Sequence, residues 1–398
     1  MRRERAARPF VIFCTAVAVV STSKGMLTPL VPLYALQLDA SPALVGLLVS
    51  SGFWLPSLLA LAVGVTVDRL GPRLPLLIGT ATIVVAPLAV ALFGTIAALA
   101  VAQVVLGLAQ LLVVLAAQSS VGREPDPRLR LRDYGWYSGF QSGGKFAGPL
   151  VAGLVADGFG FPAAFATAGA VSALSLATFL FTARAEPVVG PGAPAQTPMG
   201  GELTRLLGLG GIRMALLSSC AVVFALAMVT TFMPLRLSEL AFSATAIGAL
   251  FSLKAFAGML VRPALRFVVE RHGGSRARTL TTMTLLLALG VALLAVFDTF
   301  ALLAFAVVLA GFGSGITQPL SLALVADHAD AGRRGLAIGV RLTANRVAQV
   351  VSPLLMGGVA EAVGVRAVFP VGAAVLVFVA WSIARWRGRS GVEVGAGG

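Results

Sequence analysis

The sequence predicts an all-α membrane protein with 12 transmembrane helices in two pseudo-symmetric six-helix bundles. Three observations predict this fold class: the residue composition, the lengths of the apolar runs and an internal repeat. Of the 398 residues, 58% are hydrophobic and only 12% are charged, whereas a soluble domain carries about 25% charged residues. So few charges cannot cover a surface in contact with water, and we therefore expect the lipid bilayer to surround the chain.

A membrane-spanning helix needs about 20 predominantly apolar residues, and twelve windows of the sequence satisfy this requirement. The windows in the first half are 10–34, 43–67, 74–94, 96–121, 134–157 and 162–183. Those in the second half are 211–236, 243–268, 279–297, 299–326, 335–360 and 366–386. We therefore expect an N-terminal bundle over 1–183, a Pro/Gly/Ala-rich linker over 184–210, a C-terminal bundle over 211–386 and a disordered tail over 387–398.

The arginines indicate the orientation of the spans. They concentrate in alternate loops and at both ends of the chain, whereas the intervening loops carry only Arg236 and Arg366. Basic residues remain on the cytoplasmic side of a membrane. We therefore expect a multi-pass protein of the cell inner membrane with both termini and the linker in the cytoplasm. The net charge of +14 reflects this topology, and we expect no nucleic-acid partner.

The two halves of the sequence resemble each other. The positions that match at an offset of 202 residues include Pro32 with Pro234, Ser41 with Ser243, and Gly71 with Gly273. After the fourth loop the offset becomes 204, as for Pro149 with Pro353 and Gly153 with Gly357. A parallel repeat of six spans is typical of two bundles that rock around a shared cavity.

A charged loop follows the second predicted span. Its marked residues are Gly64, Asp68, Arg69, Gly71 and Arg73. This pattern resembles the G-x-x-x-D-R-x-G-R-R loop signature of the major facilitator superfamily, and Glu270 and Arg271 belong to a degraded copy in the second half. The resemblance implies a gate in which Asp68 faces the start of the eleventh helix, where the helix dipole stabilises an anion. The alternative is an ordinary basic loop with a turn glycine.

The fifth predicted span carries four regularly placed residues, which are Gly144, Gly148, Pro149 and Gly153. They resemble the G-x-x-x-G-P-x-x-G-G signature of the drug–proton antiporter branch of the same superfamily. Small residues four apart also let helices approach closely in any membrane protein, so close helix packing is an equal alternative. Gln103 stands where that branch has an arginine in its fourth span, which weakens the prediction of proton-coupled drug export.

Positive charges inside the spans give the sharpest functional signal. The chain has three lysines, Lys24, Lys145 and Lys254, and all three fall inside predicted spans, with Arg346 at a similar depth. A cation in the middle of the bilayer costs at least about 2.5–3.5 kcal/mol, and no Asp or Glu lies at that depth. We therefore expect the charge of a small-molecule substrate to be the partner. The alternative is that carbonyls, amides and water form hydrogen bonds with these cations. The cations would then contribute to helix packing or to the opening and closing of a gate.

Amide side chains form the second group of candidates for substrate binding. Gln103 and Gln110 share one face of the fourth span, Gln318 lies in the tenth, and Gln141 and Asn345 occupy equivalent repeat positions. Because an amide is costly to bury in hydrocarbon, we expect these residues to line a polar cavity.

These observations favour a monomeric secondary transporter that moves a small solute by alternating access, with an anionic or carboxylate-bearing metabolite as the preferred substrate class. The alternative is a proton-coupled efflux antiporter of drugs or metabolites, for which a proton would be a second partner. A receptor or scaffold without transport activity is a further alternative. The sequence contains no nucleophile–base pair and no cluster of metal ligands, so we expect neither an enzyme nor a cofactor.

Overall fold

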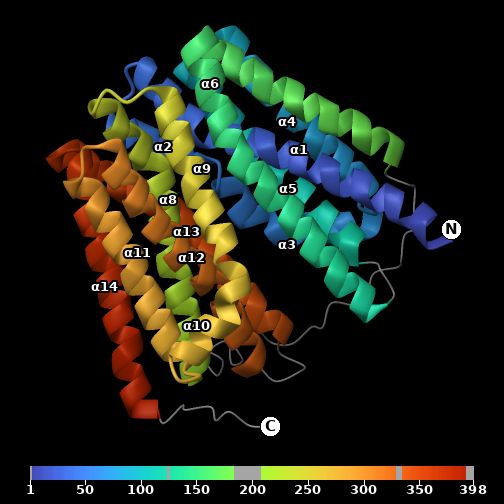
Figure 1. Ribbon diagram of the computed structural model, residues 1–398. Coiled ribbons are helices and arrows are strands. Elements are labelled where there is room, and N and C mark those ends of the chain that lie inside the picture. Colours follow the sequence, from blue (N-terminus) through green and yellow to red (C-terminus); the bar gives the residue numbers. More distant parts are fainter. Residues whose placement is uncertain (1, 123–125, 183–207, 329–333, 391–398) are drawn as a thin grey trace. The chain divides into compact units, whose positions relative to one another are not determined.

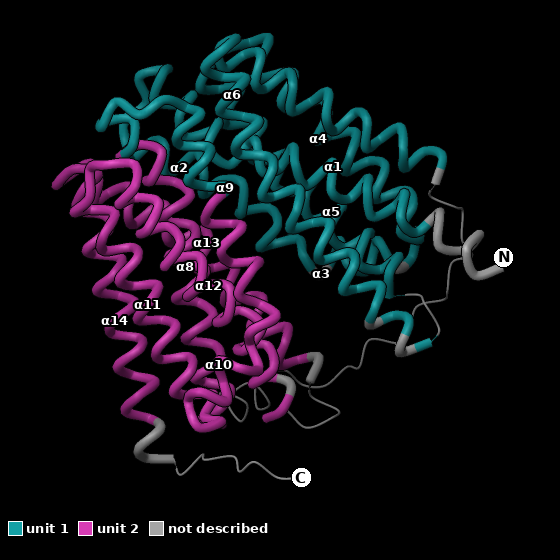
Figure 2. Tube along the Cα trace, viewed as in Figure 1, with its two compact units in different colours: residues 1–194, 237–252 teal, residues 195–236, 253–398 magenta. Residues whose placement is uncertain are grey.

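The computed structural model describes residues 2–122, 126–182, 208–328 and 334–390, and every regular element within these ranges is a helix. The all-α prediction is thereby confirmed. The chain divides into two compact units, which Figure 2 shows in different colours. Unit 1 comprises Met1–Pro194 and Leu237–Ser252, and unit 2 comprises Ala195–Arg236 and Leu253–Gly398.

The helices of unit 1 pack against one another (Figure 1). They are α1 (Arg2–Gln37), α2 (Pro42–Ser51), α3 (Trp54–Leu70), α4 (Arg73–Phe93), α5 (Ile96–Gly122) and α6 (Pro127–Thr182). The start of α9 (Ala244–Leu260) also belongs to this unit. Helix α6 contains two predicted spans, 134–157 and 162–183, which meet at a kink where Gly160 has φ +85°.

Unit 2 contains most of the remaining helices. They are α8 (Gly210–Glu239), the end of α9, the 3-10 turn η1 (Arg262–Ala264), α10 (Leu265–Arg271), α11 (Arg276–Val296), α12 (Phe300–His328), α13 (Arg334–Val363) and α14 (Val365–Ser390). Apolar side chains of α8, α11, α12 and α13 form a core that includes Ile212, Met283, Ile316 and Leu320.

Ten helical segments in the described residues are long and apolar enough to cross a membrane, and the segment in α6 holds two predicted spans. The predicted span 335–360 corresponds to α13, which is not among the ten. Its Arg341, Asn345 and Arg346 lower its hydropathy. The prediction of a multi-pass membrane fold is confirmed. The predicted linker lies almost wholly outside the described residues, whereas α14 extends past the predicted start of the tail at residue 387.

Two of the predicted spans are interrupted. The span predicted over 43–67 forms α2 and α3, which are separated at Gly52. Pro56 has no backbone N–H to donate to the Gly52 carbonyl, so the helical ladder ends there. Helix α5 packs against this break, because a Cβ on Gly107 would overlap the Gly52 carbonyl. In the span predicted over 243–268, the chain leaves α9 through the 3-10 turn η1, which contains Pro263.

The internal repeat is visible in the backbone of two equivalent turns. Asp39 and Ala241, which are 202 residues apart, have φ values of +58° and +59°. The N–H of the residue after each one donates over 3.0 Å to a carbonyl five residues back. The hydroxyls of Ser41 and Ser243 then accept hydrogen bonds from the first turn of the following helix. The two turns have equivalent backbone conformations and equivalent hydrogen bonds, which supports the parallel repeat.

In the second turn, a carboxylate from α6 adds a further cap. Asp157 accepts hydrogen bonds from the backbone N–H groups of Ala244 (2.9 Å) and Thr245 (2.8 Å), at the start of α9. One helical turn earlier on α6, a Cβ on Gly153 would lie 2.6 Å from the Cα of Thr245. Gly153 therefore leaves room for α9 to approach, and Asp157 satisfies N–H groups that the helix itself cannot pair.

Helices α1 and α6 approach closely along a line of small residues. A Cβ on Gly148 would lie 2.7 Å from the Cα of Gly25, and one on Gly144 would lie 2.9 Å from the backbone nitrogen of Thr22. Real side chains do not tolerate such distances to backbone atoms, so this interface requires glycine. The close contact brings the polar face of α1 against that of α6.

We expect Gly148→Ala to lower the stability of the protein by about 1–3 kcal/mol, because the new methyl group must push α1 away from α6. The matched control is Gly143→Ala on the same helix, where a Cβ would have no neighbour within 4 Å. Alanine is the better helix former by about 1 kcal/mol, so this variant should be neutral or slightly stabilised. Thermal unfolding of the purified variants in detergent measures both effects, and equal unfolding midpoints would contradict this account of the interface.

Candidate functional site

A cavity of about 170 Å³ lies inside unit 1, between α1, α4, α5 and α6. It brings together four of the residues that the sequence predicts to bind substrate: Lys24 of α1, Gln110 of α5, and Gln141 and Lys145 of α6. The remaining polar groups around it are Ser21, Gln118 and Tyr137, and its apolar wall includes Val17, Ile83 and Val113.

Three polar side chains of α6 form a ladder along one face of the helix. The ammonium of Lys145 donates to Gln141 Oε1 over 3.0 Å, and Gln141 Nε2 donates to the hydroxyl oxygen of Tyr137 over 3.1 Å. The three residues are spaced four apart, so their side chains stack on successive helical turns. Because an ammonium only donates hydrogen bonds, Lys145 fixes which end of the Gln141 amide faces Tyr137.

Tyr137 and Gln118 were not among the residues predicted from the sequence. Tyr137 is only 4% exposed, so its hydroxyl needs a partner inside the protein, and Gln141 provides one. The spacing of Tyr137, Gln141 and Lys145 is the sequence signal that could have revealed it. In α5, Gln118 lies eight residues after Gln110, close to the same face of the helix.

A second polar group of residues lies in unit 2. We call it the Arg341 cluster, and its members are Ser219 of α8, Gln318 and Ser321 of α12, and Arg341 and Asn345 of α13. Arg341 Nη2 donates to Gln318 Oε1 over 2.9 Å and to Ser321 Oγ over 3.0 Å. Ser219 Oγ donates to Asn345 Oδ1 over 2.9 Å.

The guanidinium of Arg341 is buried, and its hydrogen-bond partners in the described part of the chain are neutral oxygens. The residue is 5% exposed, and its Nε atom has no hydrogen-bond partner among the described residues. Arg341 was not predicted from the sequence as a binding residue, although the repeat contains the signal. At the offset of 204, Arg341 matches Tyr137 and Asn345 matches Gln141, so α13 carries its own polar ladder at the position of the ladder on α6.

The other predicted binding residues lie elsewhere. Lys254 is buried in α9 at 9% exposure, and Arg346 is half-buried on α13; both belong to unit 2. Gln103 does not line the cavity of unit 1. Its side chain lies beside the break between α2 and α3, where a Cβ on Gly52 would be 3.8 Å from Gln103 Nε2.

The predicted gating loop has a clear backbone basis. Gly71 ends α3 with φ +74°, and its repeat partner Gly273 has φ +67°, which is a conformation that glycine adopts without strain. Arg69 is exposed, Arg73 begins α4, and a Cβ on Gly64 would contact nothing within 4 Å. The side chain of Asp68 lies outside the described part of the chain.

The degraded copy of this loop makes contacts within unit 2. The carboxylate of Glu270 accepts from Arg266 Nε over 2.8 Å on the exposed face of α10, and Arg271 is exposed. Arg276, at the start of α11, forms an ion pair with Asp327 at the end of α12.

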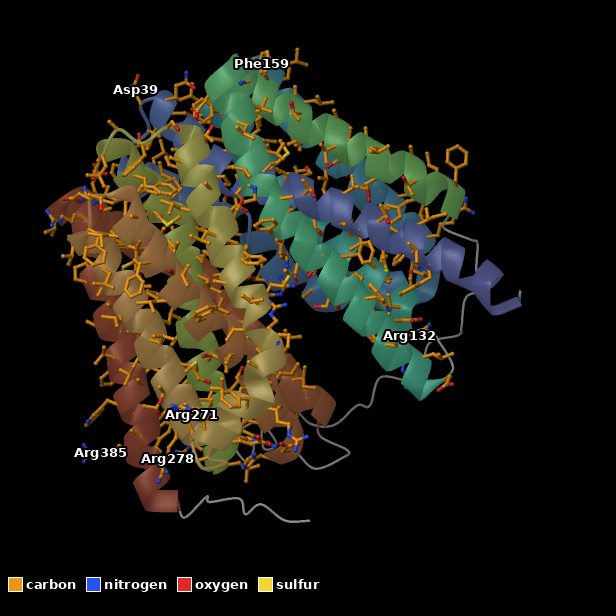
Figure 3. The ribbon with its side chains drawn as sticks, viewed as in Figure 1. Asp39, Arg132, Phe159, Arg271, Arg278 and Arg385 are labelled. Carbon is orange, nitrogen blue, oxygen red and sulfur yellow. The ribbon has the colours of Figure 1, made fainter. Side chains whose placement is uncertain are left out.

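Figure 3 labels charged residues at the ends of the helices in both units. In unit 1, the labelled Arg132 lies at the end opposite Asp39 and Phe159. In unit 2, Arg271, Arg278 and Arg385 gather at one end. The labelled arginines come from arginine-rich loops and helix ends that the sequence places on one side of the membrane.

Comparison with known structures identifies proteins of the same fold. A mutant of the nucleoside transporter NupG superposes with a TM-score of 0.81 at 17% sequence identity, covering 95% of this chain and 99% of that one. A bacterial homolog of the human lysosomal transporter Spinster, in an inward-facing and occupied conformation, gives a TM-score of 0.79 at 14% identity, with 96% of each chain covered.

A POT family transporter in complex with 5-aminolevulinic acid gives a TM-score of 0.76 at 14% identity, again with 96% of each chain covered. No curated protein sequence matches this chain. The sequence model of the Major Facilitator Superfamily, however, matches residues 13–274 and again residues 215–396, so that its matches extend over nearly the whole chain. The protein therefore belongs to the Major Facilitator Superfamily and is a membrane transporter of small solutes.

Proposed function

We propose that the protein is a secondary transporter of a small anionic solute, which it moves by alternating access, and that the unit 1 cavity forms part of the substrate site. One observation carries this proposal. Among the described residues, the cavity is lined by two lysines, three glutamines, a tyrosine and a serine, and by no aspartate or glutamate. Positive charge and hydrogen-bond donors therefore face the same small space.

The electrostatics of a membrane protein support an anion as the ligand. From position 10 onwards, helices α1, α4 and α5 carry no acidic residue. The charged side chains that line the cavity are therefore positive, as Lys24 and Lys145 are. A cavity lined by one sign of charge attracts ligands of the opposite sign, so an anionic substrate suits it better than a cationic one.

The similar structures leave the substrate class open, because one fold serves many substrates. They comprise a nucleoside transporter and a transporter bound to 5-aminolevulinic acid. The chemistry of this chain's own cavity is therefore the better guide. We also propose that both termini lie in the cytoplasm and that Asp68 acts in a gate, as the loop motif suggests.

Proton-coupled efflux of drugs or metabolites is the second candidate. It is favoured by the glycines of α6, which resemble the antiporter signature. Gly144 and Gly148, however, pack against α1, and such close packing serves helices in any branch of the superfamily. The glutamine at position 103 removes the arginine expected for that branch. We therefore rank efflux of neutral or cationic drugs below transport of an anion.

The first test is Lys145→Gln, assayed by anion flux in proteoliposomes against a panel of small organic anions. We expect flux to fall by about tenfold or more, because a hydrogen bond to a charged group contributes about 1.5–3 kcal/mol. Lys145→Arg keeps the charge and should retain substantial flux. Full activity of Lys145→Gln at normal expression would defeat the assignment, and drug export without any anion flux would favour the second candidate.

The second test concerns Arg341. We expect Arg341→Gln to reduce flux by about tenfold or more with little loss of stability, because no carboxylate is left without its partner. The matched control is Arg236→Gln, which removes another buried arginine and its 2.5 Å ion pair with the exposed carboxylate of Asp298. This pair lies outside the Arg341 cluster, so the control should keep its flux, and because Asp298 stays in contact with water it should lose little stability. If Arg341→Gln transports as well as the control does, then Arg341 has no role in binding.

A further inference from the structure

We propose that the arginine-rich end of unit 2 binds the phosphate of an anionic phospholipid on the outer faces of α11 and α14, with Arg278 and Arg385 as the residues that contact it. The partner is a bilayer lipid with a negatively charged headgroup, such as phosphatidylglycerol. This site is separate from the unit 1 cavity and does not depend on which solute is transported. It is carried by two arginines, an aromatic cluster and the exposed apolar residues next to them.

Helices α11 and α14 are packed neighbours. Arg278 lies in the first turn of α11 and Arg385 in the last turns of α14, and Figure 3 shows both at one end of unit 2. Both side chains are exposed. A single pair of helices therefore places two arginines, far apart in the sequence, at the same end.

Below each arginine, the helix presents an exposed apolar stripe. Residues three or four positions apart share one face of a helix. The exposed residues that continue from Arg278 along α11 are Thr282, Leu285 and Leu289, and those that continue from Arg385 along α14 are Trp381, Phe378 and Val371. Both stripes change from cationic to apolar in the same direction, as a phospholipid does from its headgroup to its acyl chains.

The spacing within the stripes matches the dimensions of a membrane. Seven residues separate Arg385 from Phe378, and seven separate Arg278 from Leu285, which corresponds to about 10 Å along each helix axis. The headgroup region is about 5–8 Å thick on each side of the hydrocarbon core. When Phe378 and Leu285 lie among acyl chains, the two arginines therefore reach the level of the lipid phosphates.

An aromatic cluster holds Arg385 in place. Its Cζ atom lies 5.1 Å from the centroid of the Trp381 ring, and the rings of Trp381 and Phe378 lie 6.0 Å apart. A guanidinium above an aromatic face is attracted by the ring. Its N–H groups, which lie around the edge of the guanidinium plane, can still donate to a phosphate.

The other arginines at this end have their own partners. Arg213 of α8 lies 4.9 Å from the centroid of the Trp386 ring. In the described part of unit 2, the carboxylates at this end each pair with a different arginine, and the pairs are Arg266–Glu270 and Arg276–Asp327. Neither Arg278 nor Arg385 forms an ion pair with a described carboxylate. Their charge therefore attracts an anion from outside the chain.

A lipid phosphate suits this surface better than a dissolved one does. An inorganic phosphate would contact the two arginines alone, whereas a phospholipid would also cover Phe378 and Leu285 with its acyl chains. The cluster of Trp381 with Phe378 is typical of a helix at the boundary between headgroups and hydrocarbon. The exposed apolar residues thus commit the surface to a partner that lies in the bilayer.

The experiment measures quenching of Trp381 fluorescence by phosphatidylglycerol with brominated acyl chains, compared with phosphatidylcholine with the same chains. The chain has four tryptophans, and the substitutions Trp54→Phe, Trp136→Phe and Trp386→Phe leave Trp381 as the reporter in the full-length protein in mixed micelles. We expect the anionic lipid to quench at a mole fraction about tenfold lower, because each arginine near an anionic surface strengthens binding by about fivefold. About 1 M salt should reduce this preference.

Substitutions in the reporter protein test the two arginines. Arg278→Gln and Arg385→Gln should each lower the preference for the anionic lipid by about fivefold, and the double variant should lose it. The matched control is Arg266→Gln, which removes a charge at the same end from a 91% exposed side chain that already pairs with Glu270, and it should keep the preference. Because both lipids are compared on one protein, a change of selectivity is distinguished from a loss of folded protein.

Native mass spectrometry of the unsubstituted protein gives a second readout, in which we expect phosphatidylglycerol to be retained in preference to phosphatidylcholine. Equal quenching and equal retention of the two lipids would overturn the proposal. A loss of preference in Arg266→Gln as large as in Arg385→Gln would show a general attraction to a basic surface in place of this site. Displacement of the anionic lipid by millimolar inorganic phosphate would make a dissolved anion the ligand. None of these results depends on solute flux, so this proposal and the proposed function fail separately.

Discussion

The cost of keeping positive charge away from water is the constraint on which the rest of this structure depends. A cation in a poorly hydrated site is stable only where polar groups take the place of its lost hydration. Arg341, which is 5% exposed, has the oxygens of Gln318 and Ser321 as neutral hydrogen-bond partners. Lys145 is more exposed, and it too donates to a neutral oxygen, that of Gln141. Amides and hydroxyls can hold a cation in position without cancelling its charge, which leaves that charge available to a ligand.

The packing of the helices also determines where the charged side chains lie. Glycines on both helices let α1 lie directly against α6, and this contact brings Lys24 and Lys145 to one cavity although 121 positions separate them in the chain. Larger residues at Gly144 or Gly148 would separate the helices and widen the cavity. The sequence motif that resembles an antiporter signature thus has a plain structural consequence, which is to set the distance between two charged helices.

Much of the fold could be predicted from the sequence, because apolar length and arginine distribution are properties of the bilayer rather than of particular contacts. The turn glycines Gly71 and Gly273 could also be predicted, because a positive φ angle is unfavourable for most other residues. Four predicted binding residues, Lys24, Gln110, Gln141 and Lys145, do meet in one cavity. They were accessible because a charge or an amide in an apolar run is already an anomaly in the sequence.

The residues that were missed depend on three-dimensional contacts. Tyr137 lies near the end of a span, where an aromatic residue is commonplace, and only its burial beside Gln141 shows its role. Asp157 resembles an ordinary loop acid until α9 is seen to begin beside it. The break at Gly52 depends on Gly107 of another helix as well as on the nearby Pro56. Pairings of this kind arise only when helices distant in the sequence pack together.

The paired turns at Asp39 and Ala241 show two halves with one backbone plan, and the polar ladders on α6 and α13 show how far the side chains have since diverged. The charged member of the first ladder is Lys145, whose counterpart in the second is Gln349, while Arg341 stands opposite the uncharged Tyr137. Descent from a duplicated ancestor explains both facts, with the scaffold inherited twice and the charges redistributed afterwards. One backbone plan thus presents a lysine-containing polar face in the first half of the chain and an arginine-containing one in the second, so the two halves differ in chemistry while they share a scaffold.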